Sequence, residues 1–483
     1  MLVNNDLQDR WIPRYFRLAI ANMLSNLMVP LSGMVSVSFL GHLQDIRHLA
    51  GVALATVVFN YFYRALNFLR LSVTGTTAQA TGRNDQVVFN YFYRALNFLR
   101  LSVTGTTAQA TGRNDQEEVL LLGLRNVLIA LGLGFVVLLL QYPLRELGFI
   151  VLNNTPEVKA AAVDYFNTRI WGVPAVLVNM VLFGWLMGRE QSQKVLVLSV
   201  FGNVVNIILS YQMILRAGLE SMGAGLAQAL SQFLMMMLGL IWVKSEIQWQ
   251  EIRAVAPQLW DKSAWNETFA LSRDLFIRTL AIGFTFWAFT NLFAGMGRIA
   301  FAENVLLIEF MTLGIQILNG LSYATETLTG NFHGTKEQGQ MVPLLGVSIG
   351  VTLMFAVIMS LTCILFPQTV FGLLTNHTEI TTHIDPYIPW LMSVLGLYAF
   401  AVSIEAYFFG LAEGLILRNA AFIATGLGFI PTAALAWKLQ SVHLLWLAMS
   451  LFIVTRIAVQ GIQIPRTLKL AAEDIPPAEK TQC

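Results

Sequence analysis

Three glutamates and one arginine occur inside long apolar stretches of this chain. They are Glu309, Glu326, Glu405 and Arg278. An ionisable group at membrane depth costs roughly 2.5–3.5 kcal/mol on insertion scales, so it marks a candidate functional site. A carboxylate can hold either a proton or another cation and can exchange one for the other. The competing interpretation is a glutamate–arginine salt bridge whose role is purely structural.

A second set of candidates is polar but uncharged. Asn203, Asn206 and Ser210 are spaced i, i+3 and i+7, which places them on one face of a helix. Two further candidates would join them from other helices: Asn179, and Ser36 next to a bend expected near Pro30. Such groups can bind a polar substrate or water, although ordinary hydrogen bonds between helices explain them equally well.

Composition indicates the elements that must position these residues. The chain is 56% hydrophobic and only 12% charged, whereas a typical soluble domain carries about 25% charged residues. Its net charge of +2 gives no reason to expect nucleic acid binding. The two cysteines form no metal-binding pattern, and the HExxH, GxSxG and Walker sequences of common enzyme classes are absent. The sequence therefore predicts a polytopic membrane protein that is not an enzyme and needs no metal.

Apolar blocks of about 20 residues, the length that crosses a bilayer, predict twelve transmembrane helices. These fall at 15–41, 48–82, 117–143, 157–187, 193–214, 219–243, 271–296, 300–330, 341–366, 383–412, 415–437 and 441–464. The longest polar joint, 245–270, divides them into an N-terminal six-helix lobe (1–244) and a C-terminal six-helix lobe (271–466), followed by a polar tail (467–483). We expect the joint, the tail and both termini in the cytoplasm.

One segment does not fit this scheme, because residues 57–86 recur without a change at 87–116. Lysines and arginines favour one side of a twelve-helix arrangement, as cytoplasmic loops do, and a thirteenth crossing would invert every later loop. The second copy should therefore add no crossing. Because 49–56 is contiguous only with the first copy, we expect that copy to complete the second helix. The second copy is then expected as an amphipathic helix at the cytoplasmic face, or as a protrusion.

The two lobes repeat short glycine-containing patterns. Residues 183–188 match 409–414, and 77–82 match 325–330. Each pair is separated by six helices, an even number, so the lobes should share one orientation about an axis along the membrane normal. Two such bundles enclose a cleft that can open to either side by rocking, which is the geometry of alternating access.

Several runs resemble the DinF branch of the multidrug and toxic compound extrusion family. They lie at 21–42 (ANMLSNLMVPLSGMVSVSFLGH), 48–56, 203–211, 273–279 and 410–420. The resemblance implies a cation-coupled antiporter that exports organic compounds across the cell membrane against inward flow of H⁺ or Na⁺. It implies a small organic substrate, the lipid bilayer as surroundings, no cofactor beyond the coupling ion, and a monomer.

Four positions depart from the acidic pattern of that branch. Where its members usually carry Asp, this chain has Ser36, Ser210, Asn319 and Glu405. We therefore expect ion coupling to depend on Glu405 with Asn319 nearby. The candidates for ion coupling are Glu405, Asn319, Glu309 and Glu326. The candidates for the substrate cavity are Ser36, Pro30, Asn179, Asn203, Asn206, Ser210, Tyr211 and Arg278.

Two alternatives stay open at this stage. A flippase for lipids or lipid-linked oligosaccharides, from the same superfamily, would need a strongly cationic cavity; this chain lacks a dense arginine cluster, but Arg64, Arg70, Arg278 and Arg456 keep that possibility open. A membrane protein without transport activity is the other alternative, because the duplication and the missing aspartates are unusual.

Overall fold

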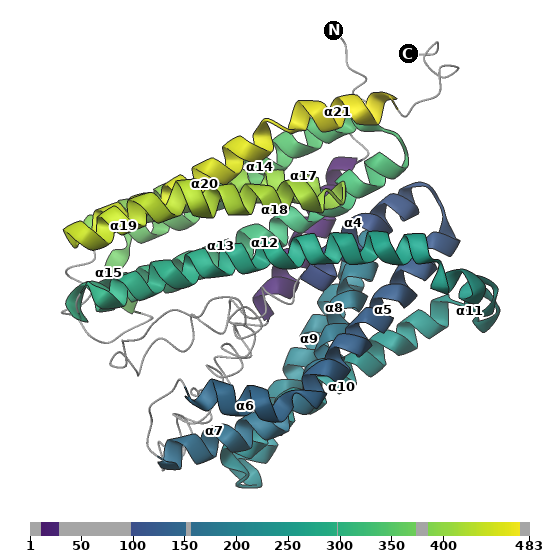
Figure 1. The fold of residues 1–483 in the computed structure, drawn as a ribbon, viewed down its shortest axis with the longest axis horizontal. Helices are drawn as coiled ribbons and strands as arrows, with labels where there is room; N and C mark the ends of the chain where they lie inside the picture. Colours follow the sequence, from purple (N-terminus) through teal and green to yellow (C-terminus); the bar gives the residue numbers. More distant parts are fainter. Residues whose placement is uncertain (1–10, 29–97, 151–155, 297, 373–384, 474–483) are drawn as a thin grey trace.

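The computed structural model describes residues 11–28, 98–150, 156–296, 298–372 and 385–473, all of which form helices and their connections (Figure 1). After a helix within 11–28, the N-terminal lobe contains α4 (Phe98–Gly112), α5 (Gln116–Leu139), α6 (Gln141–Ile150), α7 (Pro156–Arg169), α8 (Val173–Gly188), α9 (Ser192–Ser210) and α10 (Glu220–Glu246). The C-terminal lobe contains α12 (Lys262–Gly295), α13 (Arg298–Gly334), α14 (Met341–Leu365), α15 (Pro367–Gly372), α17 (Ile388–Gly410), α18 (Gly414–Ile423), α19 (Ile430–Leu439), α20 (Val442–Gly461) and α21 (Ile464–Glu473).

Nine helices in the described ranges are long and apolar enough to cross a membrane. They are Gln116–Leu139, Lys159–Gly188, Ser192–Arg216, Glu220–Glu246, Lys262–Phe293, Gln338–Leu365, Ile388–Gly410, Gly414–Leu439 and Val442–Leu468. Each covers most of a predicted span, and α13 also covers the predicted span 300–330. Large apolar side chains on their outer faces are exposed, such as Leu139 and Leu427, as lipid contact requires.

The joint between the lobes is itself largely helical. The short helix α11 (Trp249–Val255) and a 3₁₀ turn (Ala256–Trp260) fill much of 245–270, and α12 already begins at Lys262. Asp261 starts α12 by accepting a hydrogen bond from the backbone N–H of Ser263. At the other end, the predicted tail begins inside α21, and residues beyond 473 lie outside the described ranges.

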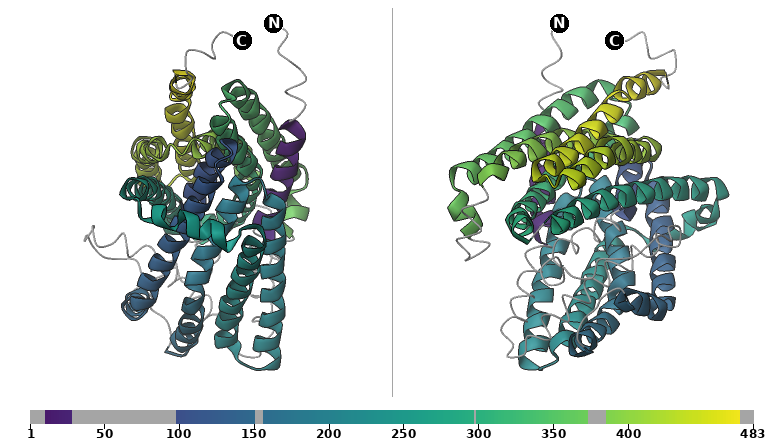
Figure 2. Two further views of the ribbon diagram at one scale, coloured as in Figure 1. Left: turned by 90° about the vertical axis from the view of Figure 1, so that its right-hand side faces the viewer. Right: turned by 60° about the vertical axis from the view of Figure 1, so that its left-hand side comes forward.

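The helices form two groups that converge at one end (Figure 1). Helices α5, α8, α9 and α10 lie on one side, and α12, α13, α17, α18 and α20 on the other, with α4 where they meet. The groups diverge toward α6 and α7 on one side and toward α15 and α19 on the other, and the views in Figure 2 show the same separation. Residues of both groups line a cavity between them.

The expected position of the second copy was wrong. Its described part forms α4, which packs against α8 and α13, and 11 of the 15 residues of α4 are buried. The two copies have identical side chains, so the local sequence cannot determine which copy packs in the bundle. The second copy also joins α5 through the short turn 113–115. The first copy lies outside the described residues.

Small residues let α4 approach its neighbours closely. A Cβ added to Gly105 would lie 2.0 Å from the backbone oxygen of Phe409, and one added to Gly334 would lie 2.1 Å from that of Gln109. Gly410 is equally confined, 2.5 Å from the backbone oxygen of Glu326. Gly105, Gly334 and Gly410 therefore lie along one seam of backbone contacts among α4, α13 and α17, where the lobes meet.

Removing one copy of the duplicated segment should leave the fold intact, because a single copy occupies the position between α8 and α13. Deleting 57–86 or 87–116 yields the same chain, since the copies are identical. We expect this shortened protein to purify as a monodisperse species with an unchanged or higher melting temperature. A loss of folded protein would show that the bundle needs both copies.

Replacing Gly410 by Ala should loosen the seam, because the new methyl group has no space beside the α13 backbone. Overpacking of this kind costs about 1–3 kcal/mol, and the melting temperature of the purified protein should fall accordingly. Gly396→Ala is the matched control on the same helix, since in the described structure no atom lies within 4 Å of its added Cβ. Equal melting temperatures for the two variants would contradict the seam.

Candidate functional site

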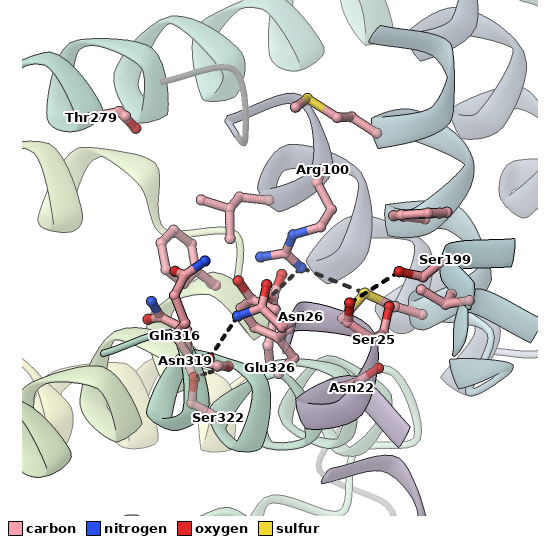
Figure 3. Close-up of a pocket in the computed structure, with 18 of the residues that line it drawn as sticks. Asn22, Ser25, Asn26, Arg100, Ser199, Thr279, Gln316, Asn319, Ser322 and Glu326 are labelled. Atoms are coloured by element: carbon pink, nitrogen blue, oxygen red, sulfur yellow. Dashed lines mark hydrogen bonds and ion pairs between the residues drawn. The ribbon is translucent and has the colours of Figure 1, made fainter. Parts of the chain in front are cut away.

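A cavity of about 250 Å³ lies between the lobes. Helix 11–28, α4, α8, α9 and α10 contribute to one wall, and α12, α13, α17 and α20 to the other. Figure 3 shows Arg100 and Glu326 near its centre, with Asn22, Ser25 and Asn26 facing them from helix 11–28. Among the described residues, the charged side chains that line it belong to three arginines and two glutamates: Arg100, Arg278, Arg456, Glu326 and Glu405.

Glu405 lies between two arginines. Its carboxylate is 2.7 Å from the guanidinium of Arg278 on α12 and also accepts a hydrogen bond from Arg456 on α20. Gln460, one turn further along α20, donates to the same carboxylate at 3.5 Å. Glu405 itself is only 3% exposed. The three helices therefore converge on one buried charge, which two cations stabilise.

A second ion pair joins the two lobes. Arg100 on α4 donates to Glu326 on α13 at 3.4 Å, and Glu326 is fully buried. The guanidinium of Arg100 also stacks 3.9 Å from the ring centroid of Tyr323, a cation–π contact. Sequence reasoning missed Arg100 because it placed the second copy at the surface. The pair lies beside the glycine seam, so separating the lobes there must break it.

Three of the neutral candidates line this cavity. Asn179 donates to the backbone and side-chain oxygens of Gln232, at 2.9 and 3.1 Å. Asn203 donates to the backbone oxygen of Ser199, and Asn319 accepts from the hydroxyl of Tyr398 at 3.0 Å. Their polar groups thus take part in hydrogen bonds while they border the space between the lobes.

The other candidates lie elsewhere. Asn206 is buried behind the wall, where it donates to Gln228 at 3.2 Å. Ser210 is also buried, and Tyr211 is 40% exposed on the outside, so neither lines the cavity, contrary to expectation. Asn206 points at α10, because its amide contacts Gln228 and Ser231 on that helix. Glu309 lies on α13 with its side chain outside the described structure, and Ser36 and Pro30 fall in the undescribed range.

Sequence reasoning also missed Asn22. This residue is 2% exposed, lines the cavity, and has no hydrogen-bond partner for either amide atom among the described residues. A buried polar group without a partner costs about 1–3 kcal/mol, so Asn22 is a candidate contact for a ligand or water. Its position, eight residues before Pro30 in an apolar helix, was the available signal.

Comparison with known proteins decides the family. The MatE family model matches residues 22–88, 86–212 and 276–434. This chain belongs to the MatE family. Both copies of the duplicated segment are matched, since the first match ends and the second begins where the copies join. The MatE protein is thus a multi-pass membrane transporter with a MATE fold, and not an enzyme, as the sequence predicted.

Sequence relatives support this assignment. DNA damage-inducible protein F of Escherichia coli is 28% identical over 91% of this chain and 89% of its own length. A probable multidrug resistance protein NorM of Thermotoga maritima is 23% identical over 82% of this chain and 79% of its own length. The predicted resemblance to the DinF branch is confirmed, and homologues include multidrug efflux proteins.

Two solved structures have the same fold. A structure described as the outward-facing conformation of a multidrug resistance MATE transporter superposes with a TM-score of 0.78 at 16% identity, over 95% of this chain and 96% of that one. A superfamily transporter from Pyrococcus furiosus, whose description reports reverse polarity of its binding pocket, gives 0.77 at 16% identity over 95% of each chain.

The charges of the Glu405 cluster predict unequal effects of two substitutions. Arg456→Gln leaves Glu405 paired with Arg278, whereas Glu405→Gln leaves two guanidinium groups together without their carboxylate. Uncompensated buried charge costs about 3–5 kcal/mol, so Glu405→Gln should lower the melting temperature more than Arg456→Gln. Arg253→Gln, at an exposed position on α11, serves as the control. If Arg456→Gln is equally or more damaging, the charge assignment is wrong.

Proposed function

We propose that the protein is a secondary antiporter of the cell membrane that exports organic compounds in exchange for H⁺ or Na⁺. The observation that supports this proposal is the cavity between the lobes, which both lobes line with ionised and amide side chains. Lipid-facing surfaces do not carry such groups, because they are costly in hydrocarbon. A polar space enclosed by two pseudo-symmetric bundles is what alternating access requires.

The glycine seam closes one end of the cavity, as one state of an alternating-access cycle requires. Gln109 on α4 donates to the backbone oxygen of Gly410 at 2.8 Å, beside the Arg100–Glu326 pair. Switching access would separate these contacts and bring the diverging ends of the lobes together. With the termini in the cytoplasm, the closed end is cytoplasmic and the open end faces outward.

Within this scheme Glu405 is the coupling residue, with Asn319 nearby and Glu326 as a second carboxylate in the cavity. A cation that neutralises Glu405 would release Arg278 and Arg456 from it, and so would change which side chains face the substrate. Each of the two glutamates is thus a point at which ion binding could alter both substrate contacts and helix contacts.

Replacing Glu405 by Gln should abolish gradient-driven export, because the neutral amide cannot exchange its charge. Proteoliposomes loaded with ethidium or with dansylglycine report on export while H⁺ and Na⁺ gradients are collapsed in turn. We expect at least a tenfold loss of rate in Glu405→Gln with substrate binding retained, partial recovery in Glu405→Asp, and no change in Glu251→Gln, an exposed control. Unchanged transport by Glu405→Gln would exclude this role, and no transport by folded wild-type protein would favour the inactive alternative.

The proposed orientation can be tested with single cysteines at opposite ends of the bundle. Thr335, just after α13, and Ala217, at the far end of the α9 segment, are both exposed. With Cys363 and Cys483 replaced by Ser, a membrane-impermeant maleimide should label Ala217→Cys in intact cells and Thr335→Cys only in inside-out vesicles. The reverse pattern would place the termini outside.

A lipid flippase remains the second candidate, and one observation favours it. In the part of the chain that the structure describes, more arginines than glutamates line the cavity. An exporter of organic cations would be expected to present an excess of negative charge to its substrate.

A further inference from the structure

The formal charge of the cavity is not balanced. Three arginines and two glutamates line it, and no aspartate or lysine does so among the described residues. All five side chains are buried, so solvent screens their charges far less than at a surface. A net positive charge in such a place attracts an anion and repels a cation.

Other carboxylates in the chain do not restore the balance. Glu309 is 17 residues from Glu326 on α13, which corresponds to about 25 Å along the helix. Asp274 lies outside the cavity and pairs with Arg418 at 2.8 Å and with Arg273 at 3.2 Å. The only acidic residues in the sequence 29–97 are Asp45 and Asp85, each two residues from an arginine.

The cluster also keeps donors that its glutamates do not use. The Nε atoms of Arg278 and Arg456 are buried and have no hydrogen-bond partner in the described structure. Asn22, from the opposite wall, adds an amide that lacks partners. Guanidinium groups bind carboxylate, sulfonate and phosphate oxygens well, because their donors match the geometry of these anions.

We propose that the cavity binds its substrate through a single anionic group held by Arg100, Arg278 and Arg456. This inference rests on the proposed transport function but concerns binding alone. The remaining wall is apolar and indicates an amphipathic molecule; it includes Leu101, Val176, Met180, Phe183, Met235 and Phe286. The anionic group belongs either to a free organic anion or to the head group of a lipid.

Binding of three dansyl compounds that differ in charge tests this proposal. They are dansylglycine (anionic), dansylglycinamide (neutral) and dansylcadaverine (cationic), measured by fluorescence with the full-length protein in phosphatidylcholine nanodiscs and corrected with empty nanodiscs. One unit of charge at a few ångströms corresponds to about a tenfold or larger change in affinity in a partly screened site. We expect dansylglycine to bind at least tenfold more tightly than dansylglycinamide, and dansylcadaverine to bind most weakly. Equal affinities, or a preference for the cation, would overturn the proposal.

Two variants should move this preference in opposite directions. Arg278→Gln brings the formal charge to zero and should remove the preference for dansylglycine over dansylglycinamide. Glu326→Gln raises the charge to +2 and should strengthen it about tenfold, while Arg253→Gln leaves it unchanged. Because the two variants have opposite signs, general destabilisation cannot imitate the result, and equal shifts in both would refute the electrostatic origin.

The two sources of the anion are distinguished by competition. If a lipid head group is the natural ligand, a water-soluble phosphatidate with two short acyl chains should displace dansylglycine. If the natural ligand is a free organic anion, octanoate should displace it. Displacement by either supports the anion site, and displacement by neither opposes it. These binding measurements need no ion gradient. If the protein binds dansylglycine as expected but does not transport it, the proposed function is rejected and the anion site is not.

Discussion

Two buried arginines, Arg278 and Arg456, share the single carboxylate of Glu405, and this is the constraint on which the rest of the structure depends. Arg278 and Arg456 come from helices that are far apart in sequence, and each would be costly at membrane depth without a carboxylate. One glutamate on α17 satisfies both, and this fixes α12, α17 and α20 relative to one another. The charge that stabilises the C-terminal lobe is therefore also the charge that borders the cavity.

The contact between the lobes uses a second physical principle, close backbone packing. Gly105 and Gly112 on α4 meet α17 and α13 without intervening side chains, and such contacts depend on dispersion and on weak hydrogen bonds rather than on solvent exclusion. The Arg100–Glu326 pair lies at this junction and in the cavity at once. Separating the lobes here would therefore also separate a buried ion pair inside the cavity.

Much of the fold could be predicted from the sequence, because apolar length and polar joints follow directly from the membrane. The sequence also picked out Glu405, Asn319 and Arg278, which line the cavity, since ionised and amide groups are conspicuous in apolar helices. It could not show that Asn206 contacts α10 or that Ser210 is buried away from the cavity. Periodicity defines a face of a helix and not the neighbour of that face. It also could not decide which identical copy becomes α4, since that choice depends on the chain connection to α5.

The excess of positive charge has a consequence for coupling. A proton or Na⁺ on Glu405 would release Arg278 and Arg456, and the released arginines would hold an anionic substrate more firmly. In this conformation the cation and the substrate would therefore assist rather than oppose each other's binding. Exchange of cation for substrate would then need a restriction on the conformational change. The cavity must be unable to close at its open end while it holds both ligands. For an anion the inside-negative membrane potential already favours export, by roughly 2.3 kcal/mol per charge at 100 mV. In the proposed antiporter, the coupling cation would therefore control the order of conformational steps more than it would supply the energy.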